Sequence, residues 1–244
     1  MEIMVVGGRA AVGAVKRPTG SGGAPPSMLH PSHRVLIALL ATAVAAAAGP
    51  AFTVETDCSA APDCEAFATK SKAICEEWYP KINAILFGKE HPLPVATLHL
   101  KFEPMNGIAH ATGDGIHISQ EWVTKKRPDD YGMVVHELTH VVQNYKGGGE
   151  GWLTEGIADY IRHKYFEKDG EKLRVDAVNG SYRQSYTTAA AFLLWLEAHK
   201  DKDIVRKLNI ASHDGTYSRA LFNKYCGADV DALWKEFTDR LRVK

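Results

Sequence analysis

The spacing of apolar residues divides the chain after residue 51 into helices and strands. Over residues 64–87, apolar side chains recur at intervals of three, four and seven, which predicts an amphipathic helix. Residues 94–103 alternate between apolar and polar positions, which predicts a half-buried strand. Two shorter strands are predicted at residues 107–111 and 115–119, where a turn of Thr, Gly and Asp joins them into a hairpin.

A helical period returns in the second half of the chain. Helices are predicted at residues 131–145 and 153–166, with three consecutive glycines between them. Four further helices are predicted at residues 186–199, 203–209, 218–225 and 230–241. The order of a helix, then strands, then helices predicts a single α+β domain over residues 52–244, with a mainly helical C-terminal half.

The first fifty residues have a different character. Residues 1–27 contain six glycines and no apolar period, so we expect a disordered or untranslated extension. From Met28, a basic segment, an apolar run and small residues follow one another, which is typical of a secretory signal peptide over residues 28–51. A membrane anchor is the alternative, although the run is shorter than the ~20 residues that a span needs. We therefore expect a secreted or periplasmic protein without a stable membrane anchor after signal cleavage.

Charge and cysteine content add two expectations. The chain has 29 basic and 29 acidic residues and no basic cluster, which argues against a nucleic-acid partner. Four cysteines in an exported protein favour two disulfides. Among the three possible connectivities, we prefer Cys58 with Cys64 and Cys75 with Cys226, because the second bond would close a long loop. Free buried thiols are the alternative.

The helix predicted at residues 131–145 carries the strongest chemical signal. Its run HELTH matches the motif HExxH, in which two histidines four residues apart project from one helix face. His136 and His140 can therefore bind one zinc ion, and zinc lowers the pKa of its water ligand to about 7. Glu137, beside them, is the expected general base for this water. Two core histidines with other partners are the alternative.

A catalytic zinc site has three protein ligands and one open position. The glycines after the first helix allow the next helix to fold back beside it, which brings Glu155 and Asp159 close on a shared face. We expect Glu155 to bind the metal and Asp159 to orient a ligand histidine by a hydrogen bond. The reverse assignment is the alternative.

Hydrolysis through such a site also needs a donor that stabilises the developing oxyanion. Tyr182 and Tyr186, four apart at the start of the helix predicted at residues 186–199, are our candidates. Aromatic packing at the edge of the core is the alternative for both residues.

Four runs of the chain together resemble the plant basic secretory protein family, whose bacterial members are grouped with it as zinc peptidases. They are HELTHVVQNY, GWLTEGIADYIR, YRQSYTTAAAFLLWLE and LFNKYCGADVDALWKEF. The resemblance covers about residues 52–243 and implies a gluzincin-like metallopeptidase of zincin fold, with a small, mostly antiparallel sheet packed on the HExxH helix. It also implies the roles of His136, His140 and Glu137 given above, with Glu155 and Asp159 as the matching acidic pair. The mature chain is mildly acidic, unlike the plant proteins.

In a zincin-like fold, a strand edge above the site pairs with an extended peptide substrate. The segment expected to form this edge consists of Gly115, Ile116, His117 and Ile118. His117 is expected to be exposed and not to bind metal.

The sequence therefore predicts a secreted zinc metallopeptidase, acting as an endopeptidase on peptides or proteins. A secreted zinc-binding defence or interaction protein without turnover is the alternative, although such a protein has no use for Glu137. An exopeptidase is a third hypothesis, which ranks lower because no acidic anchor for a substrate amine is identifiable from the spacing.

Overall fold

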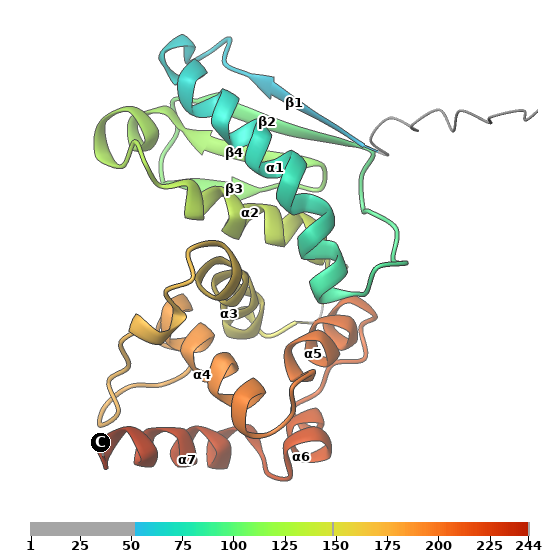
Figure 1. Ribbon diagram of the computed structural model, residues 1–244, viewed down its shortest axis with the longest axis vertical. Coiled ribbons are helices and arrows are strands. Elements are labelled where there is room, and N and C mark those ends of the chain that lie inside the picture. Colours follow the sequence, from blue (N-terminus) through green and yellow to red (C-terminus); the bar gives the residue numbers. More distant parts are fainter. Residues whose placement is uncertain (1–51, 148, 244) are drawn as a thin grey trace, which may run out of the picture. The chain divides into compact units, whose positions relative to one another are not determined.

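The computed structural model describes residues 52–147 and 149–243. The expected extension at residues 1–27 and the expected signal peptide at residues 28–51 thus lie outside the described residues. Within the described ranges, no helix combines the length and the apolar character that crossing a membrane requires. A small sheet forms in the first part of this region, and helices make up the remainder (Figure 1).

The sheet contains four strands in the order β1-β2-β4-β3. They are β1 (Thr53–Asp57), β2 (Thr97–Glu103), β3 (Ala109–Ala111) and β4 (Gly115–Ser119). β1 pairs with β2 and β2 with β4 in parallel, and only β3 with β4 is antiparallel. The expectation of a mostly antiparallel sheet is therefore wrong, whereas the hairpin of β3 and β4 is confirmed.

Connections between the strands explain this mixed sheet. A helix follows β1 and carries the chain back to the end of the sheet where β2 begins, as parallel pairing requires. After β2 the chain forms β3 at the edge and then returns as β4 between β2 and β3. β1 has no sequence signal, because only Val54 of its five residues is buried.

Seven α-helices lie in the described residues, and each agrees with a predicted range to within a few residues. They are α1 (Glu65–Leu86), α2 (Tyr131–Gln143), α3 (Gly151–Ile161), α4 (Tyr186–His199), α5 (Ile204–His213), α6 (Ala220–Cys226) and α7 (Val230–Arg242). The helix predicted to end at residue 166 leaves the α conformation after Ile161 and continues as a π-helical turn, Arg162–Phe166. The α+β class is confirmed.

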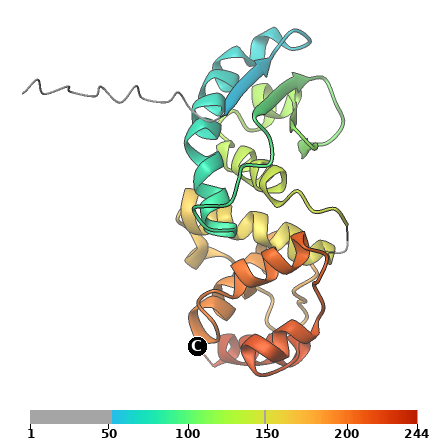
Figure 2. The same cartoon turned by 90° about the vertical axis from the view of Figure 1, so that its right-hand side faces the viewer.

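The helix α2 lies at the centre of the packing. α1 packs on β1 and β2, α2 packs on β3 and β4, and α3 lies between α2 and α4 (Figure 1, Figure 2). Because α2 has the sheet on one side and α3 on the other, ten of its thirteen residues are buried. Any polar side chain that α2 carries on these faces is therefore held in a fixed environment.

The four cysteines are free thiols in this structure. Neither expected disulfide, Cys58 with Cys64 or Cys75 with Cys226, is present, so the alternative of free thiols describes them. Burial raises the pKa of Cys64 to about 11 and raises the pKa of Cys75 as well. These thiols therefore stay protonated, which is the form that does not attack a disulfide.

A glycine sets the distance between α3 and α4. A Cβ at Gly156 would lie 2.7 Å from the Cβ of Ala189, which the backbone of α4 holds rigidly. We expect Gly156→Ala to lower the free energy of unfolding by about 1–3 kcal/mol, the usual cost of overpacking.

Gly151, at the start of the same helix, is the matched control. Nothing lies within 4 Å of a Cβ at this position, so Gly151→Ala should raise stability by about 0.4–1 kcal/mol by restricting the unfolded chain. Urea denaturation measures both values. Equal effects of the two substitutions would contradict the close approach of α3 and α4.

Candidate active site

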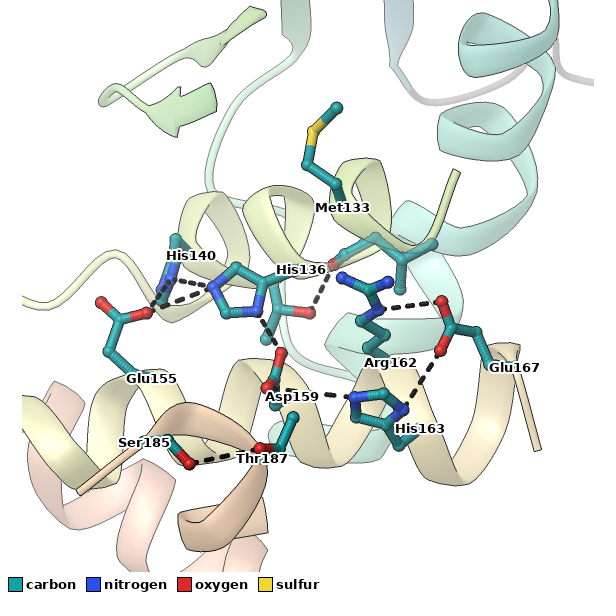
Figure 3. Close-up of polar contacts among 12 residues, drawn as sticks. Met133, His136, His140, Glu155, Asp159, Arg162, His163, Glu167, Ser185 and Thr187 are labelled. Carbon is teal, nitrogen blue, oxygen red and sulfur yellow. Dashed lines mark hydrogen bonds and ion pairs between the residues drawn. The ribbon is translucent and has the colours of Figure 1, made fainter. Parts of the chain in front are cut away.

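Local sequence signals position the helix that carries the HExxH motif. The Asp130 side chain caps the start of α2 by accepting a hydrogen bond from the Met133 N–H at 3.2 Å. Asn144 ends the helix in the left-handed conformation, with φ of 41°. Between these caps, His136 and His140 extend from α2 toward α3 (Figure 3).

The chain then turns back so that α3 runs beside α2. The Gln143 side chain donates a hydrogen bond from Nε2 to the Thr154 carbonyl oxygen at 3.0 Å, which fixes the end of α2 to the first turns of α3. Glu155 consequently points at both histidines, and Asp159 points at His136 (Figure 3). The fold-back expected from the glycines is present in the structure.

Three side-chain atoms from the two helices meet at one point. The Nε2 atoms of His136 and His140 lie 3.1 Å apart, and Glu155 Oε2 lies 3.2 Å from the first and 3.3 Å from the second. A tetrahedral ion with bonds of ~2.0–2.1 Å separates its ligand atoms by about 3.3 Å. The three atoms therefore form one face of such a tetrahedron, and this donor set fits a single metal ion.

The remaining ring nitrogens are held by neighbouring side chains. His136 Nδ1 lies 2.7 Å from Asp159 Oδ1, and His140 Nδ1 lies 2.7 Å from Gln143 Oε1. Each ring can donate its Nδ1–H to an oxygen and keep Nε2 for a metal, an arrangement typical of metal-binding histidines. Asp159 thus lies on the side of His136 away from the shared point, where it orients the ring; this geometry favours Glu155 as the ligand.

Hydrogen bonds and opposite charges shift the pKa values of His136 and Glu155 in the absence of an ion. Burial lowers the pKa of His136, but the hydrogen bonds with Asp159 and Glu155 outweigh it and raise this pKa to about 9. Burial raises the pKa of Glu155, but the two histidines outweigh it and lower this pKa to about 2. The metal-free site therefore holds a proton near neutral pH that an ion would have to replace.

The three atoms open into a pocket of about 870 Å³. Its lining comes from β3 and the residue before it, from α2 and its cap, from α3 and the π-helical turn after it, and from the start of α4 with its cap: Ile108, Ala109, His110, Ala111, Asp130, Met133, His136, Glu137, His140, Glu155, Asp159, Arg162, Ser185, Tyr186 and Thr187. Glu137 lines this pocket next to the histidines. Among the described residues, no hydrogen bond or ion pair engages its carboxylate, so it remains available to take a proton.

The two candidate tyrosines lie in different surroundings. Tyr186 lines the pocket, is 54% exposed and stacks its ring on His136 with centroids 5.7 Å apart. The Glu155 charge, with some burial, raises the pKa of Tyr186, so its hydroxyl keeps its proton. Tyr182 is buried and donates its hydroxyl to Asp231 at 2.7 Å. Tyr182 is therefore a residue of the aromatic core and, unlike Tyr186, is not among the residues that line the pocket.

The segment expected to form the substrate-binding edge lies inside the sheet. Gly115, Ile116, His117 and Ile118 belong to β4, which pairs with β2 on one side and β3 on the other. Ile116 and Ile118 are fully buried, and His117 bonds Glu103 at 2.6 Å. The strand at this edge of the sheet is β3, and its residues line the pocket. The order of strands in the sheet decides which strand is outermost, and the local sequence pattern does not contain that order.

Two residues that we did not expect from the sequence, Gln143 and Arg162, also contribute to the site. Gln143 follows His140 by three residues, which places its amide on the same helix face as the histidine ring. This spacing is visible in the sequence and could have identified the contact. Arg162 lines the pocket and donates to Asp130 at 3.0 Å and to Glu167 at 2.9 Å. Its position depends on the π-helical turn after α3, which has no recognisable sequence signal.

Competition between a metal ion and the proton of His136 predicts pH-dependent binding. Below its pKa of about 9 the ring must lose a proton to bind an ion, so Zn²⁺ affinity should rise about tenfold per pH unit between about pH 6 and pH 8. Isothermal titration calorimetry in buffers of different ionisation enthalpy measures the affinity and the protons released. Asp159→Asn, which removes one carboxylate that raises this pKa, should flatten the dependence. An affinity constant across this pH range would contradict the prediction.

Comparison with known proteins assigns the chain to a family. Residues 33–237 match the family model BSP, described as a peptidase of plants and bacteria. No curated protein and no solved structure matches the chain significantly. The match includes both helices that carry the site and agrees with the resemblance of the four sequence runs. The chain therefore belongs to the family of peptidases of plants and bacteria, the basic secretory protein family.

Proposed function

We propose that this peptidase is a secreted, zinc-dependent endopeptidase whose active site is the pocket between β3, α2 and α4. One observation carries the proposal: three metal-ligand atoms lie within 3.1–3.3 Å of one another at the base of a pocket that also contains an unengaged glutamate. Export is supported by the signal-peptide pattern at residues 28–51.

His136, His140 and Glu155 would hold the ion. Two imidazoles and one carboxylate form a donor set that suits zinc, and a site with three protein ligands would leave a ligand position for water or substrate. When bound, zinc supplies a positive charge that polarises a peptide carbonyl and makes water acidic enough to react near neutral pH. A purely structural zinc site would instead have a fourth protein ligand.

Glu137 acts as the general base in this proposal. It follows His136 directly on α2, and its carboxylate lines the pocket next to the proposed ligands. Glu137 takes a proton from the attacking water and later gives it to the amine of the departing peptide. Transfer by a positioned side chain of this kind contributes typically ~10²–10⁴-fold to a rate.

Tyr186 is the proposed donor to the oxyanion of the tetrahedral intermediate. Ser185 caps α4 by accepting from the Thr188 N–H at 3.2 Å, and this cap fixes Tyr186 at the pocket wall. Its hydroxyl remains protonated at neutral pH, as a donor must be. Because the side chain is 54% exposed, it can rotate toward a bound substrate.

In this proposal, the edge strand β3 binds the extended main chain of a substrate. In the hairpin, the Ser119 N–H donates to the Ile108 carbonyl and the Thr112 N–H donates to the Gly115 carbonyl. In an antiparallel pair, hydrogen-bonded and non-hydrogen-bonded residue pairs alternate. Ala109 and Ala111 are in non-hydrogen-bonded pairs, so their backbone N–H and C=O groups point away from β4. Both residues line the pocket, where they can pair with the main chain of a substrate.

Replacing the base tests the proposal. Glu137→Gln keeps the size of the side chain but cannot take up a proton, so kcat on a peptide substrate should fall about 10²–10⁴-fold while Zn²⁺ affinity is retained. A fluorogenic peptide assay and a zinc-binding titration measure the two quantities.

Glu90→Gln, at an exposed position, is the control and should leave both quantities unchanged. Equal activity of Glu137→Gln and the parent protein would exclude Glu137 as the base. A parent protein that binds zinc but cleaves no peptide would instead favour a binding protein without turnover.

The edge-strand contact has its own test. Ala109→Pro removes an N–H that points away from the sheet, so it should leave the fold and Zn²⁺ affinity intact. Loss of one main-chain hydrogen bond to substrate should lower kcat/KM about fivefold. Ala109→Ser, which keeps the N–H, is the matched control. The same kcat/KM for both variants would show that substrate does not pair at this position.

A further inference from the structure

A group of charged side chains continues beyond the proposed metal ligands into the protein. It consists of Asp159 at the end of α3, His163 in the π-helical turn, and Glu167 and Asp169 after it; we call it the His163 cluster. His163 is 8% exposed and Asp159 5% exposed, so both lie in a medium where an unpaired charge is costly. Neither the HExxH motif nor the proposed mechanism accounts for His163.

Carboxylates surround both ring nitrogens of His163. Its Nδ1 lies 2.8 Å from Asp169 Oδ1 and 3.1 Å from Glu167 Oε2, and its Nε2 lies 3.9 Å from Asp159 Oδ2 (Figure 3). Burial lowers the pKa of His163, but the hydrogen bonds with Glu167 and Asp169 outweigh it and raise this pKa. A positively charged ring therefore suits this position between acids.

The backbone after α3 is shaped to bring these acids to the ring. The Glu167 N–H donates to the Arg162 carbonyl at 2.8 Å, a five-residue π-helical spacing that keeps Glu167 beside both Arg162 and His163. Lys168 then adopts φ of 56°, and the Asp169 N–H donates to the His163 carbonyl at 2.9 Å. This local fold returns Asp169 to the ring.

A second contact ties the cluster to the helix of the HExxH motif. Glu167 also accepts from Arg162 Nε at 2.9 Å, and this ion pair lies against Gly132 of α2. A Cβ at Gly132 would overlap Glu167 Oε1 and lie 2.6 Å from Arg162 Nε. The start of α2, one turn before His136, therefore rests directly on the residues that surround His163.

Asp159 is the point where the cluster meets the proposed metal site. One of its oxygens bonds His136 Nδ1 at 2.7 Å, and the other faces His163 Nε2. A buried carboxylate is costly unless its charge is compensated, so a cationic partner on the second oxygen of Asp159 stabilises the carboxylate in one orientation. Among the described residues, His163 is the group that faces this oxygen.

We propose that His163 is a positioning residue of the metal site: it holds Asp159 in the plane in which Asp159 orients His136. This inference rests on the proposed function. His163 does not touch the metal ligands or the substrate pocket, and it acts through Asp159. Its effect should therefore appear in metal affinity and should depend on the presence of the Asp159 carboxylate.

The test measures Zn²⁺ dissociation constants by competition with a chromophoric chelator. His163→Phe keeps a ring but removes both nitrogens, and should weaken Zn²⁺ binding about tenfold, the lower end of the range for partners of ligand histidines. Tyr79→Phe is the matched control, since it also removes a buried polar contact, to Val95, but on α1. It should lower the melting temperature and leave Zn²⁺ affinity unchanged.

A double-mutant cycle separates positioning from general destabilisation. In the Asp159→Asn background, His163→Phe should have little further effect on the dissociation constant, because the group through which it acts is gone. If His163→Phe does not fold, His163→Gln, which keeps a hydrogen-bond donor, replaces it in the test. This variant should lose less Zn²⁺ affinity than His163→Phe.

The outcomes are distinguishable. Unchanged zinc affinity in His163→Phe, or equal losses with and without Asp159, would overturn the positioning role while leaving the zinc site intact. A parent protein without zinc affinity would overturn the proposed function itself.

Discussion

The hydrogen bond between His136 Nδ1 and Asp159 Oδ1, at 2.7 Å, is the interaction on which the site depends. It joins the two helices in a buried region and fixes the direction in which the His136 ring faces Glu155. Gly156 allows α4 to approach α3 closely, so α3 is packed between α2 and α4. Packing on both sides of α3 thereby converts two short sequence motifs into one set of converging ligand atoms.

Local sequence patterns predict much of this arrangement. The helices follow from apolar periods that are long enough to be unambiguous, and HExxH places two rings on one face because the α-helix fixes i,i+4 geometry. The glycines after α2 correctly indicate that Glu155 and Asp159 return to these rings. Each of these signals lies within a few turns of the residues it positions.

Features that depend on distant contacts are not predictable in this way. Strand β1 pairs with β2 across a helix of 22 residues, and its five residues bury one side chain, so no period marks it. Tyr182 and Tyr186 are four residues apart, a spacing that does not distinguish them, yet Tyr182 packs against Trp152 and Trp234 in the core. His163 follows Asp159 by four residues, a spacing that by itself does not identify a functional contact.

The shortness of β3 has a further consequence. An exposed strand is a template on which any extended chain can be added, including another copy of the same protein. With three residues, β3 offers outward backbone groups at two positions, Ala109 and Ala111. A long, flat edge would favour self-association, whereas an edge of three residues offers few backbone groups for it and still presents the two outward positions that the proposed substrate pairing uses.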